Sequence, residues 1–246
     1  MHLPRSGRRM NKTAIAFGTF DGVHRGHQEI INAMLTAAEG RGLDPLIYTF
    51  SNHPAGLFGK SFSMIMTDGE RLAALKGFAP VAAERLDRQL AATEPEDFVR
   101  YMAEKYRMGA AVAGFNYTFG SRGAGNMDTL RRLGGKYGFE VYEIPALMYG
   151  GEPVSSTRIR ACIERGDIAG ANAMLGHELE LSCKETSQNG HAVLKVADGL
   201  VLPAPGRYIT EAEGRRLICG VLPGGSIEPE EPLREIKKLR FIGRIG

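Results

Sequence analysis

The sequence predicts an α/β protein in which a parallel sheet is followed by a small, mainly antiparallel β domain. Strand and helix patterns alternate through the first 145 residues, which is typical of parallel strands joined by right-handed crossovers. After Gly176 the pattern changes to short strands with proline and glycine between them. With 246 residues, the chain is long enough for one large domain or two small ones.

The strand patterns of the first part lie at residues 13–17, 45–50, 80–86, 110–114 and 139–145. Between them, apolar residues recur at helical spacing from His27 onward and through 69–76 and 127–137. Another helix is expected to open at Thr93-Glu94-Pro95-Glu96, which has the form of a capping box with an early proline. Ligands bind where the strands of such a sheet end at their carboxyl side, so the turns after these strands are candidate sites.

Three segments follow from these patterns. Residues 1–12 are predicted to be a disordered basic tail, with Met1 or Met10 as the true start. Residues 13–178 form the α/β domain. Residues 179–246 form the β domain, with strands expected at 179–184, 192–196, 215–221 and 239–245.

Composition restricts the function classes. The net charge is only +3 and tryptophan is absent, so no nucleic-acid partner is expected. No apolar run approaches membrane-spanning length. The three cysteines, Cys162, Cys183 and Cys219, are far apart and have no metal-binding spacing, which favours a reducing, cytoplasmic location. The oligomeric state stays open.

The most informative stretch is the turn at residues 18–27 (GTFDGVHRGH), between an apolar strand and an apolar helix. Glycine lets phosphates approach the backbone, and a helix start offers unpaired N–H groups to an anion. His24 and His27 are three residues apart and are expected to face the same way. Two imidazoles there can donate hydrogen bonds to a phosphate that gains charge during a reaction. Asp21 is expected to bond backbone within its own turn.

A second motif, SSTRIR at residues 155–160, follows the last strand of the α/β domain. Ser155 or Ser156 is a good N-cap for a helix ending near Gly166. Hydroxyl groups, helix-start N–H groups and an arginine together suit a polyphosphate. Arg158 and Arg160 point to different faces of that helix, so one of them is expected to reach the phosphates.

Two further loops carry aromatic or polar side chains. The loop GFNYTFG at residues 114–120 brackets an amide with aromatic rings, which suits a flat heterocycle. Its rings could instead pack beneath the loop. The loop TFSNHP at residues 49–54 follows the second strand, where Phe50 could be a buried strand residue and His53 an ordinary turn residue.

The HxGH pattern resembles the nucleotidyltransferase superfamily, and its longer form with Phe20-Asp21-Gly22 resembles the FMN adenylyltransferase half of bacterial FAD synthetases. The resemblance runs over about residues 13–177 and implies a Rossmann-like sheet. It implies that Arg160 holds the triphosphate and that residues 49–54 form a flavin-and-phosphate loop, although Asn52 stands where the family usually has proline. The expected catalytic residues are His24, His27 and Arg160. The expected nucleotide-binding residues are Gly18, Thr19, Phe20, Gly26, Ser156, Thr157 and Arg158. The expected flavin-binding residues are Phe50, His53, Pro54, Asn116 and Phe119.

The resulting hypothesis is an FMN adenylyltransferase that makes FAD and pyrophosphate from ATP and FMN. Magnesium is expected to be bound mainly through the ATP phosphates, because no carboxylate cluster suggests a protein metal site. Residues 179–246 are similar to a shortened riboflavin kinase barrel, but the family's Gly-rich segment and Pro-Thr-Ala-Asn motif do not occur, so no kinase activity is expected. The alternatives are another phosphate acceptor or a non-catalytic flavin- or nucleotide-binding regulator.

Overall fold

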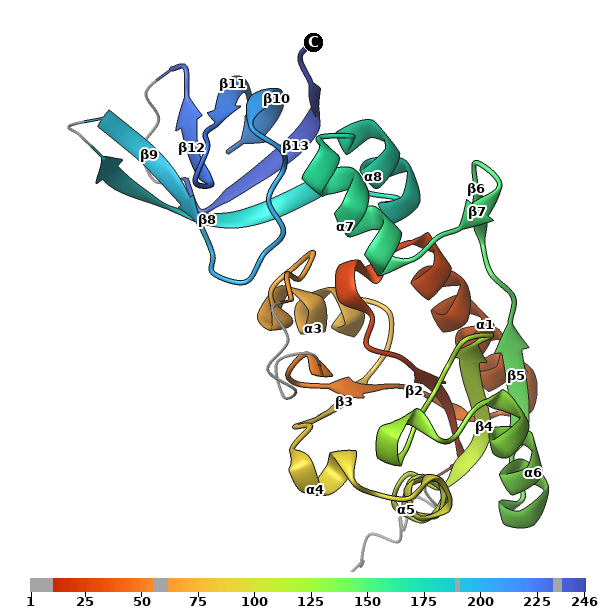
Figure 1. Cartoon of the computed structure of the whole chain (residues 1–246). Coiled ribbons are helices and arrows are strands. Elements are labelled where there is room, and N and C mark those ends of the chain that lie inside the picture. The colour runs from red at the N-terminus through yellow and green to blue at the C-terminus, as the bar shows by residue number, and fades with distance from the viewer. Residues whose placement is uncertain (1–10, 55–61, 189–190, 232–235) are drawn as a thin grey trace, which may run out of the picture. The chain divides into compact units, whose positions relative to one another are not determined.

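The computed structural model of the chain describes residues 11–54, 62–188, 191–231 and 236–246. They divide into two compact units, each built from separate stretches of the chain (Figure 1). The first unit comprises residues up to 18, 30–49 and 78–145. The second comprises residues 19–29, 50–77 and 146–246. The two units are described separately below.

The first unit is built on a parallel five-stranded sheet in the order β3-β2-β1-β4-β5 (Figure 1). The strands are β1 (Thr13–Phe17), β2 (Asp44–Phe50), β3 (Val81–Glu84), β4 (Met108–Gly114) and β5 (Glu140–Ile144). β1 pairs in parallel with β2 on one side and with β4 on the other, where Ala16 lies opposite Val112. Strands β2 and β3 therefore lie on one side of β1, and the later strands β4 and β5 lie on its other side. This strand order confirms the predicted Rossmann-like arrangement.

Short apolar side chains allow the central strands to be buried on both faces. Ile15, Ala16 and Val112 have no exposed surface, as expected of a parallel sheet covered by helices. Ile31 and Met34 of α1 (Arg25–Arg41) and Met102 of α5 (Pro95–Lys105) are also fully buried. The remaining helices of this unit are α4 (Arg88–Ala91), η2 (Ser121–Gly123) and α6 (Met127–Tyr137).

The second unit contains a closed barrel of six strands in the order β10-β11-β12-β9-β8-β13, drawn at the blue end of the colour bar in Figure 1. Every strand pair of known register in it is antiparallel, which confirms the predicted antiparallel β domain. The strands are β8 (Leu179–Gln188), β9 (His191–Val196), β10 (Gly206–Ala212), β11 (Arg215–Val221), β12 (Ser226–Pro229) and β13 (Lys238–Arg244).

The same unit contains the turns and helices that carry the two sequence motifs. These are η1 (Asp21–Val23), α3 (Asp68–Lys76), α7 (Ser156–Arg165), α8 (Ile168–Leu175) and a hairpin of β6 (Met148–Tyr149) and β7 (Glu152–Pro153). One apolar cluster runs through this unit, and it includes Ile159 and Leu175 from the helices and Leu200 and Phe241 from the barrel. The helix of the second motif and the barrel therefore share one apolar core.

Several local predictions are wrong in detail. β12 and most of β10 are missing from the predicted strands, because the glycine and proline residues within or beside them are typical of loops. The helix after Thr93 begins at Pro95, as the early proline indicates, but Glu94 is its N-cap and no side chain caps it. A capping box forms instead at the start of another helix, α3, where Thr67 and Glu70 make both reciprocal hydrogen bonds.

The predicted tail lies largely outside the described residues, and the boundary at residue 178 stays a prediction. α8 ends at Leu175 and β8 begins at Leu179, so the proposed junction is a short connection between helix and barrel. Among the described residues, no helix is both long and apolar enough to cross a membrane.

Candidate functional site

The chain leaves β1 at Phe17 and enters the histidine turn, whose backbone has a positive φ at Phe20, Gly22 and Val23. Phe20 has a left-handed backbone (φ 57°) although it is not glycine, and Gly22 follows with φ 79°. A non-glycine residue in this region is strained, and such strain concentrates at functional sites. Phe20 is fully buried and its ring lies edge-on to His27, at 5.3 Å between centroids. The ring of this predicted nucleotide-binding residue therefore packs inside the protein and presents no surface to a ligand.

The two histidines do face the same way, as predicted. Their rings are stacked with 3.5 Å between centroids and an interplanar angle of 16°. The backbone N–H of His27 donates to the carbonyl of His24 at 2.7 Å and also lies 3.3 Å from Nδ1 of the same residue, which favours the tautomer of His24 with its proton on Nε2. Nδ1 of His27 is buried and has no hydrogen-bond partner among the described residues. A buried polar atom in that state suggests a functional role.

Both imidazoles are held neutral. Burial, together with a smaller contribution from the charge of nearby His177, lowers the pKa of His24 to about 4. Burial also lowers the pKa of His27 well below its ordinary value, with smaller contributions from His24 and Arg71. Two stacked imidazolium rings would repel each other, so neutral rings with one N–H donor each suit this geometry.

We expect the protein to lose stability as the pH falls from about 6.5 to about 4, the pKa of folded His24. In that window the unfolded chain binds a proton at His24 that the folded chain does not bind. The free energy of unfolding from urea titrations should fall by about 2 kcal/mol between pH 7 and pH 5 for this residue alone. His24→Gln should lose this part of the slope, and an unchanged slope in that variant would contradict the assignment.

Asp21 corrects the sequence prediction, because its partners are distant rather than local. Its Oδ1 accepts a hydrogen bond from the backbone N–H of Ile65 at 3.0 Å. Its Oδ2 lies 2.7 Å from Nη1 of Arg160. Its backbone carbonyl accepts from the hydroxyl of Ser156 at 2.9 Å. One residue of the histidine turn therefore holds two residues of the second motif.

The second motif forms the start of α7 as predicted. Ser155 is the N-cap, and its hydroxyl accepts from the N–H of Arg158 at 3.3 Å. Arg160 turns toward Asp21, and its Nη2 also lies 3.2 Å from the hydroxyl of exposed Thr157. Arg158 turns the other way and donates to the carbonyls of Tyr149 and Glu152 in the β6–β7 hairpin. The two arginines thus point to different faces of α7, and Arg160 is the one that contacts the histidine turn.

Arg71 in α3 also contacts the histidine turn, and the sequence analysis did not single it out. Its side chain is only 2% exposed, and its guanidinium donates to the carbonyls of Thr19 and Phe50 at 3.0 and 2.7 Å. It also pairs with Asp68 at 2.7 Å. Arg71 therefore joins the start of the histidine turn to the end of β2. Its local sequence is that of an ordinary residue in a capped helix, so no local pattern marked it.

The predicted flavin residue Phe50 ends β2, and His53 and Pro54 lie in the loop after it, whose described part ends at Pro54. The His53 ring stacks on Phe62 with 4.1 Å between centroids. Phe62 also contacts Arg160, whose guanidinium carbon lies 4.4 Å from the centre of the Phe62 ring. Burial lowers the pKa of His53 to about 4, and the charges of Arg160 and Arg71 add to this effect. His53 therefore belongs to the same cluster as Arg160.

The other predicted flavin residues lie in the first unit, in the loop after β4. Asn116 is exposed, so its amide is available to a ligand. Phe119 is only 6% exposed, and its ring stacks on Tyr117 and contacts Phe98. Phe115 has the exposed ring of this loop, at 46%. Phe119 therefore fits the alternative interpretation, in which an aromatic ring packs beneath the loop.

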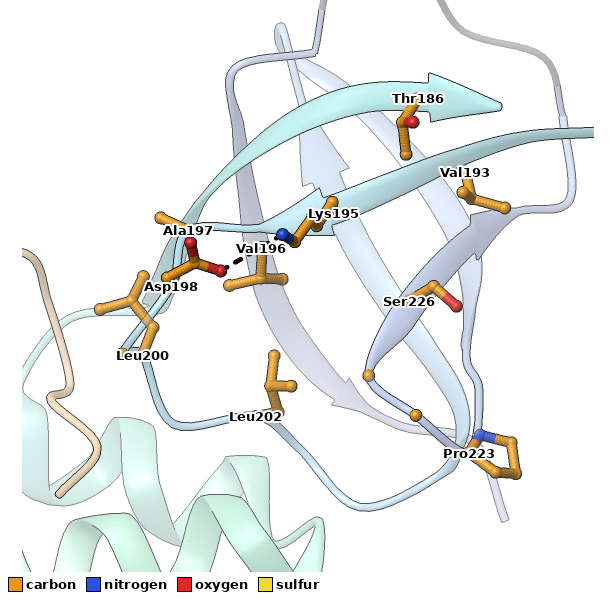
Figure 2. Close-up of a pocket in the computed structure, with 13 residues that line it drawn as sticks. Thr186, Val193, Lys195, Val196, Ala197, Asp198, Leu200, Leu202, Pro223 and Ser226 are labelled. Atoms are coloured by element: carbon orange, nitrogen blue, oxygen red, sulfur yellow. Dashed lines mark ion pairs between the residues drawn. The ribbon is translucent and has the colours of Figure 1, made fainter. Parts of the chain in front are cut away.

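The described residues contain no group of three or more His, Cys, Asp or Glu side chains that could hold a metal ion. A cavity of about 510 Å³ lies in the barrel, with Leu200 and Leu202 on one side and Val193 and Thr186 on another (Figure 2). Its charged side chains, Lys195 and Asp198, pair with each other at 3.4 Å and are largely exposed. This cavity shares no residue with the histidine cluster.

Comparison with known proteins supports the family that the sequence motifs resemble. Residues 7–158 match a family described as FAD synthetase. An FAD synthetase of Listeria monocytogenes is 30% identical over 203 residues, which cover 80% of this chain and 80% of that protein. A bifunctional riboflavin kinase/FMN adenylyltransferase of Bacillus subtilis is 32% identical over 171 residues, covering 67% of this chain and 54% of that protein. The chain spans about half the length of such bifunctional relatives.

A solved structure has the same fold along almost the whole chain. It is described as a macrolide-efflux protein from Streptococcus pneumoniae, and it superposes with a TM-score of 0.80 at 25% sequence identity. The match covers 96% of this chain and 86% of that one.

Proposed function

Because this chain belongs to the FAD synthetase family, we propose that it transfers the adenylyl group of ATP to FMN, giving FAD and pyrophosphate. The observation that carries the proposal is the cluster of His24, His27, Asp21 and Arg160 within one packing unit. This cluster combines neutral N–H donors with a guanidinium beside a helix start, which are the groups that a nucleoside triphosphate requires.

In the proposed reaction, a phosphate oxygen of FMN attacks the α-phosphorus of ATP. A new P–O bond forms, the bond from the α-phosphorus to the bridging oxygen of the β-phosphate breaks, and pyrophosphate leaves with that bond's electron pair. The acceptor is already an anion, so no strong general base is required. The main tasks of the protein are to align two anions and to stabilise the added charge at the α-phosphorus.

Each group of the cluster has a place in that scheme. Nε2–H of His24 and the N–H of His27 donate to the α-phosphate oxygens, and their low pKa values keep both rings neutral at pH 7. Arg160 binds the β- and γ-phosphates together with the hydroxyl of Thr157. Gly18, Thr19, Gly26 and Ser156 offer backbone near the phosphates. Arg158 is left out of this set, because the hairpin carbonyls hold its guanidinium.

Magnesium enters the proposal as the counter-ion of the substrate triphosphate. The described residues offer no carboxylate cage for it, and Mg²⁺ at nucleotides keeps several waters and phosphate ligands. When bound, it would neutralise part of the phosphate charge. None of the steps above is assigned to the ion.

Flavin-binding residues are proposed for each unit by itself, in residues 50–54 of the second unit and in the loop after β4 of the first. His53 lies in the same cluster as Arg160 through Phe62, which supports a role for residues 50–54 near the FMN phosphate. Asn116 is exposed and suited to hydrogen-bond the flavin ring. A contribution from Phe119 would be limited to its small exposed edge.

We also propose that the chain lacks riboflavin kinase activity, since its barrel carries neither kinase motif. The three cysteines are free and buried in the structure, which supports a reducing compartment such as the cytoplasm.

The test is to incubate purified protein with ATP, magnesium and either FMN or riboflavin, and to resolve the flavins by chromatography. FAD from FMN, with one pyrophosphate for each FAD, is the expected result. Pyrophosphate released only with another phosphorylated acceptor would replace FMN in the proposal. Flavin binding without turnover would indicate a regulator, and FMN formed from riboflavin would contradict the absence of kinase activity.

A further inference from the structure

Asp21 is a buried carboxylate whose charge is balanced by the predicted catalytic arginine. Its side chain is 2% exposed, against 15% for Arg160, and the two groups lie 2.7 Å apart. A buried charge needs a partner and hydrogen bonds to remain ionised. Burial raises the pKa of Asp21, while backbone hydrogen bonds and the charges of Arg160 and Arg71 lower it. The orientation of Arg160 therefore depends on where Asp21 is held.

Asp21 is held by residues 62–66, which we call the strap. The N–H of Ile65 donates to Oδ1 of Asp21 at 3.0 Å, and the nearby backbone of Met66 helps to lower the pKa of this carboxyl. The Ile65 side chain is 1% exposed and covers Gly22, where an added Cβ would lie 2.9 Å from its Cδ1. The strap therefore fixes both the carboxylate and the backbone of the histidine turn.

The strap in turn is held by the barrel. The N–H of Met64 donates to the carbonyl of Gly199 at 2.7 Å, and the N–H of Val201 donates to the carbonyl of Met64 at 2.8 Å. These two bonds form a parallel bridge between Met64 and Leu200. Gly199 also lines the barrel cavity, next to Leu200, which Figure 2 labels. All of these residues belong to the second unit.

We propose that Asp21 is a positioning residue that aligns Arg160 with a bound nucleoside triphosphate, and that the barrel supports it through the strap. The barrel then serves the adenylyl-transfer site without chemistry of its own. The inference rests on the proposed function for its substrate, but its primary readout is the binding of ATP rather than turnover. A positioned guanidinium loses less entropy on binding a phosphate than a mobile one does.

The test is a double-mutant cycle on the full chain, with Asp21→Asn and Leu200→Ala as its two changes. Asparagine keeps an oxygen that accepts from Ile65 but loses the charge that holds Arg160. The dissociation constant of magnesium-ATP, measured by calorimetry, should rise about 10-fold in Asp21→Asn and about 5-fold in Leu200→Ala. The double variant should bind ATP as Asp21→Asn does, because both changes act through the same carboxylate. KM for FMN should stay unchanged.

The matched control is Val193→Ala, a buried barrel position that Figure 2 shows across the cavity from Leu200. It should lower the unfolding temperature without changing ATP binding, since a merely destabilised protein loses active fraction and keeps its dissociation constant. Where Leu200→Ala fails to fold, Ile65→Val replaces it and should raise the dissociation constant about 3-fold, again without further effect in Asp21→Asn.

Unchanged ATP binding in Asp21→Asn would overturn the role of Asp21. Independent, multiplying effects of Leu200→Ala and Asp21→Asn would overturn the support by the barrel. A wild-type chain that binds ATP but makes no FAD would refute the proposed function and leave this binding test intact. A wild-type chain that binds no ATP would overturn both.

Discussion

Replacing His27 by alanine is expected to lower the turnover number for FAD synthesis by about 100-fold or more, as removal of one preorganised transition-state donor does. His27 lies stacked on His24 at the start of α1, and its buried Nδ1 has no partner among the described residues. The donor acts as charge develops at the α-phosphorus, so kcat should fall more than KM rises. Steady-state kinetics with ATP and FMN measure both.

Two companion variants make this result interpretable. His27→Gln restores an N–H donor on a flexible side chain and should recover part of the lost turnover. Glu29→Ala changes an exposed position on the same helix and should leave kcat within about 2-fold of wild type, as surface changes do. Wild-type turnover in His27→Ala would remove this residue from the mechanism.

Replacing Arg160 by alanine should reduce kcat/KM for ATP by on the order of 100-fold or more, because a charge-assisted partner of the transferring polyphosphate is lost. Most of the change should appear as a higher KM for ATP, since the β- and γ-phosphates are charged in the ground state too. The same change leaves Asp21, which is 2% exposed, without its partner. Unfolding temperatures must therefore be measured beside the kinetics.

Arg165→Ala is the matched control for Arg160→Ala. It removes an exposed arginine from the other end of α7 and should leave KM for ATP unchanged. A similar rise in KM in both variants would show that helix charge, rather than the position of Arg160, governs ATP binding. An unchanged KM in Arg160→Ala would contradict its assignment to the triphosphate.

The parts of the site that the sequence could predict are local. β1 has the predicted bounds, and Ser155 caps α7 as its residue type indicates. Spacing of three residues at a helix start was enough to place His24 and His27 on one face. In each case the signal and the structure lie within one turn of helix or one strand.

The parts that the sequence could not predict depend on tertiary contacts. Asp21 and Arg160 are 139 positions apart, and no local pattern reports which distant group meets a buried carboxylate. Arg71 looks like an ordinary helix residue until its guanidinium is found against Thr19 and Phe50. The environment of Phe119 could not be predicted for the same reason. Its sequence pattern is the same whether the ring faces a ligand or packs against the rings of Tyr117 and Phe98.

The most direct measurement of the central claim is a crystal structure of the protein with magnesium and an ATP analogue that has a methylene group between its α- and β-phosphorus atoms. The α-phosphate should lie within hydrogen-bonding distance of the imidazoles of His24 and His27, about 3 Å between heavy atoms. The β- or γ-phosphate should contact the guanidinium of Arg160. A triphosphate bound elsewhere, or one that reaches the histidines while Arg160 lies apart from it, would contradict the claim.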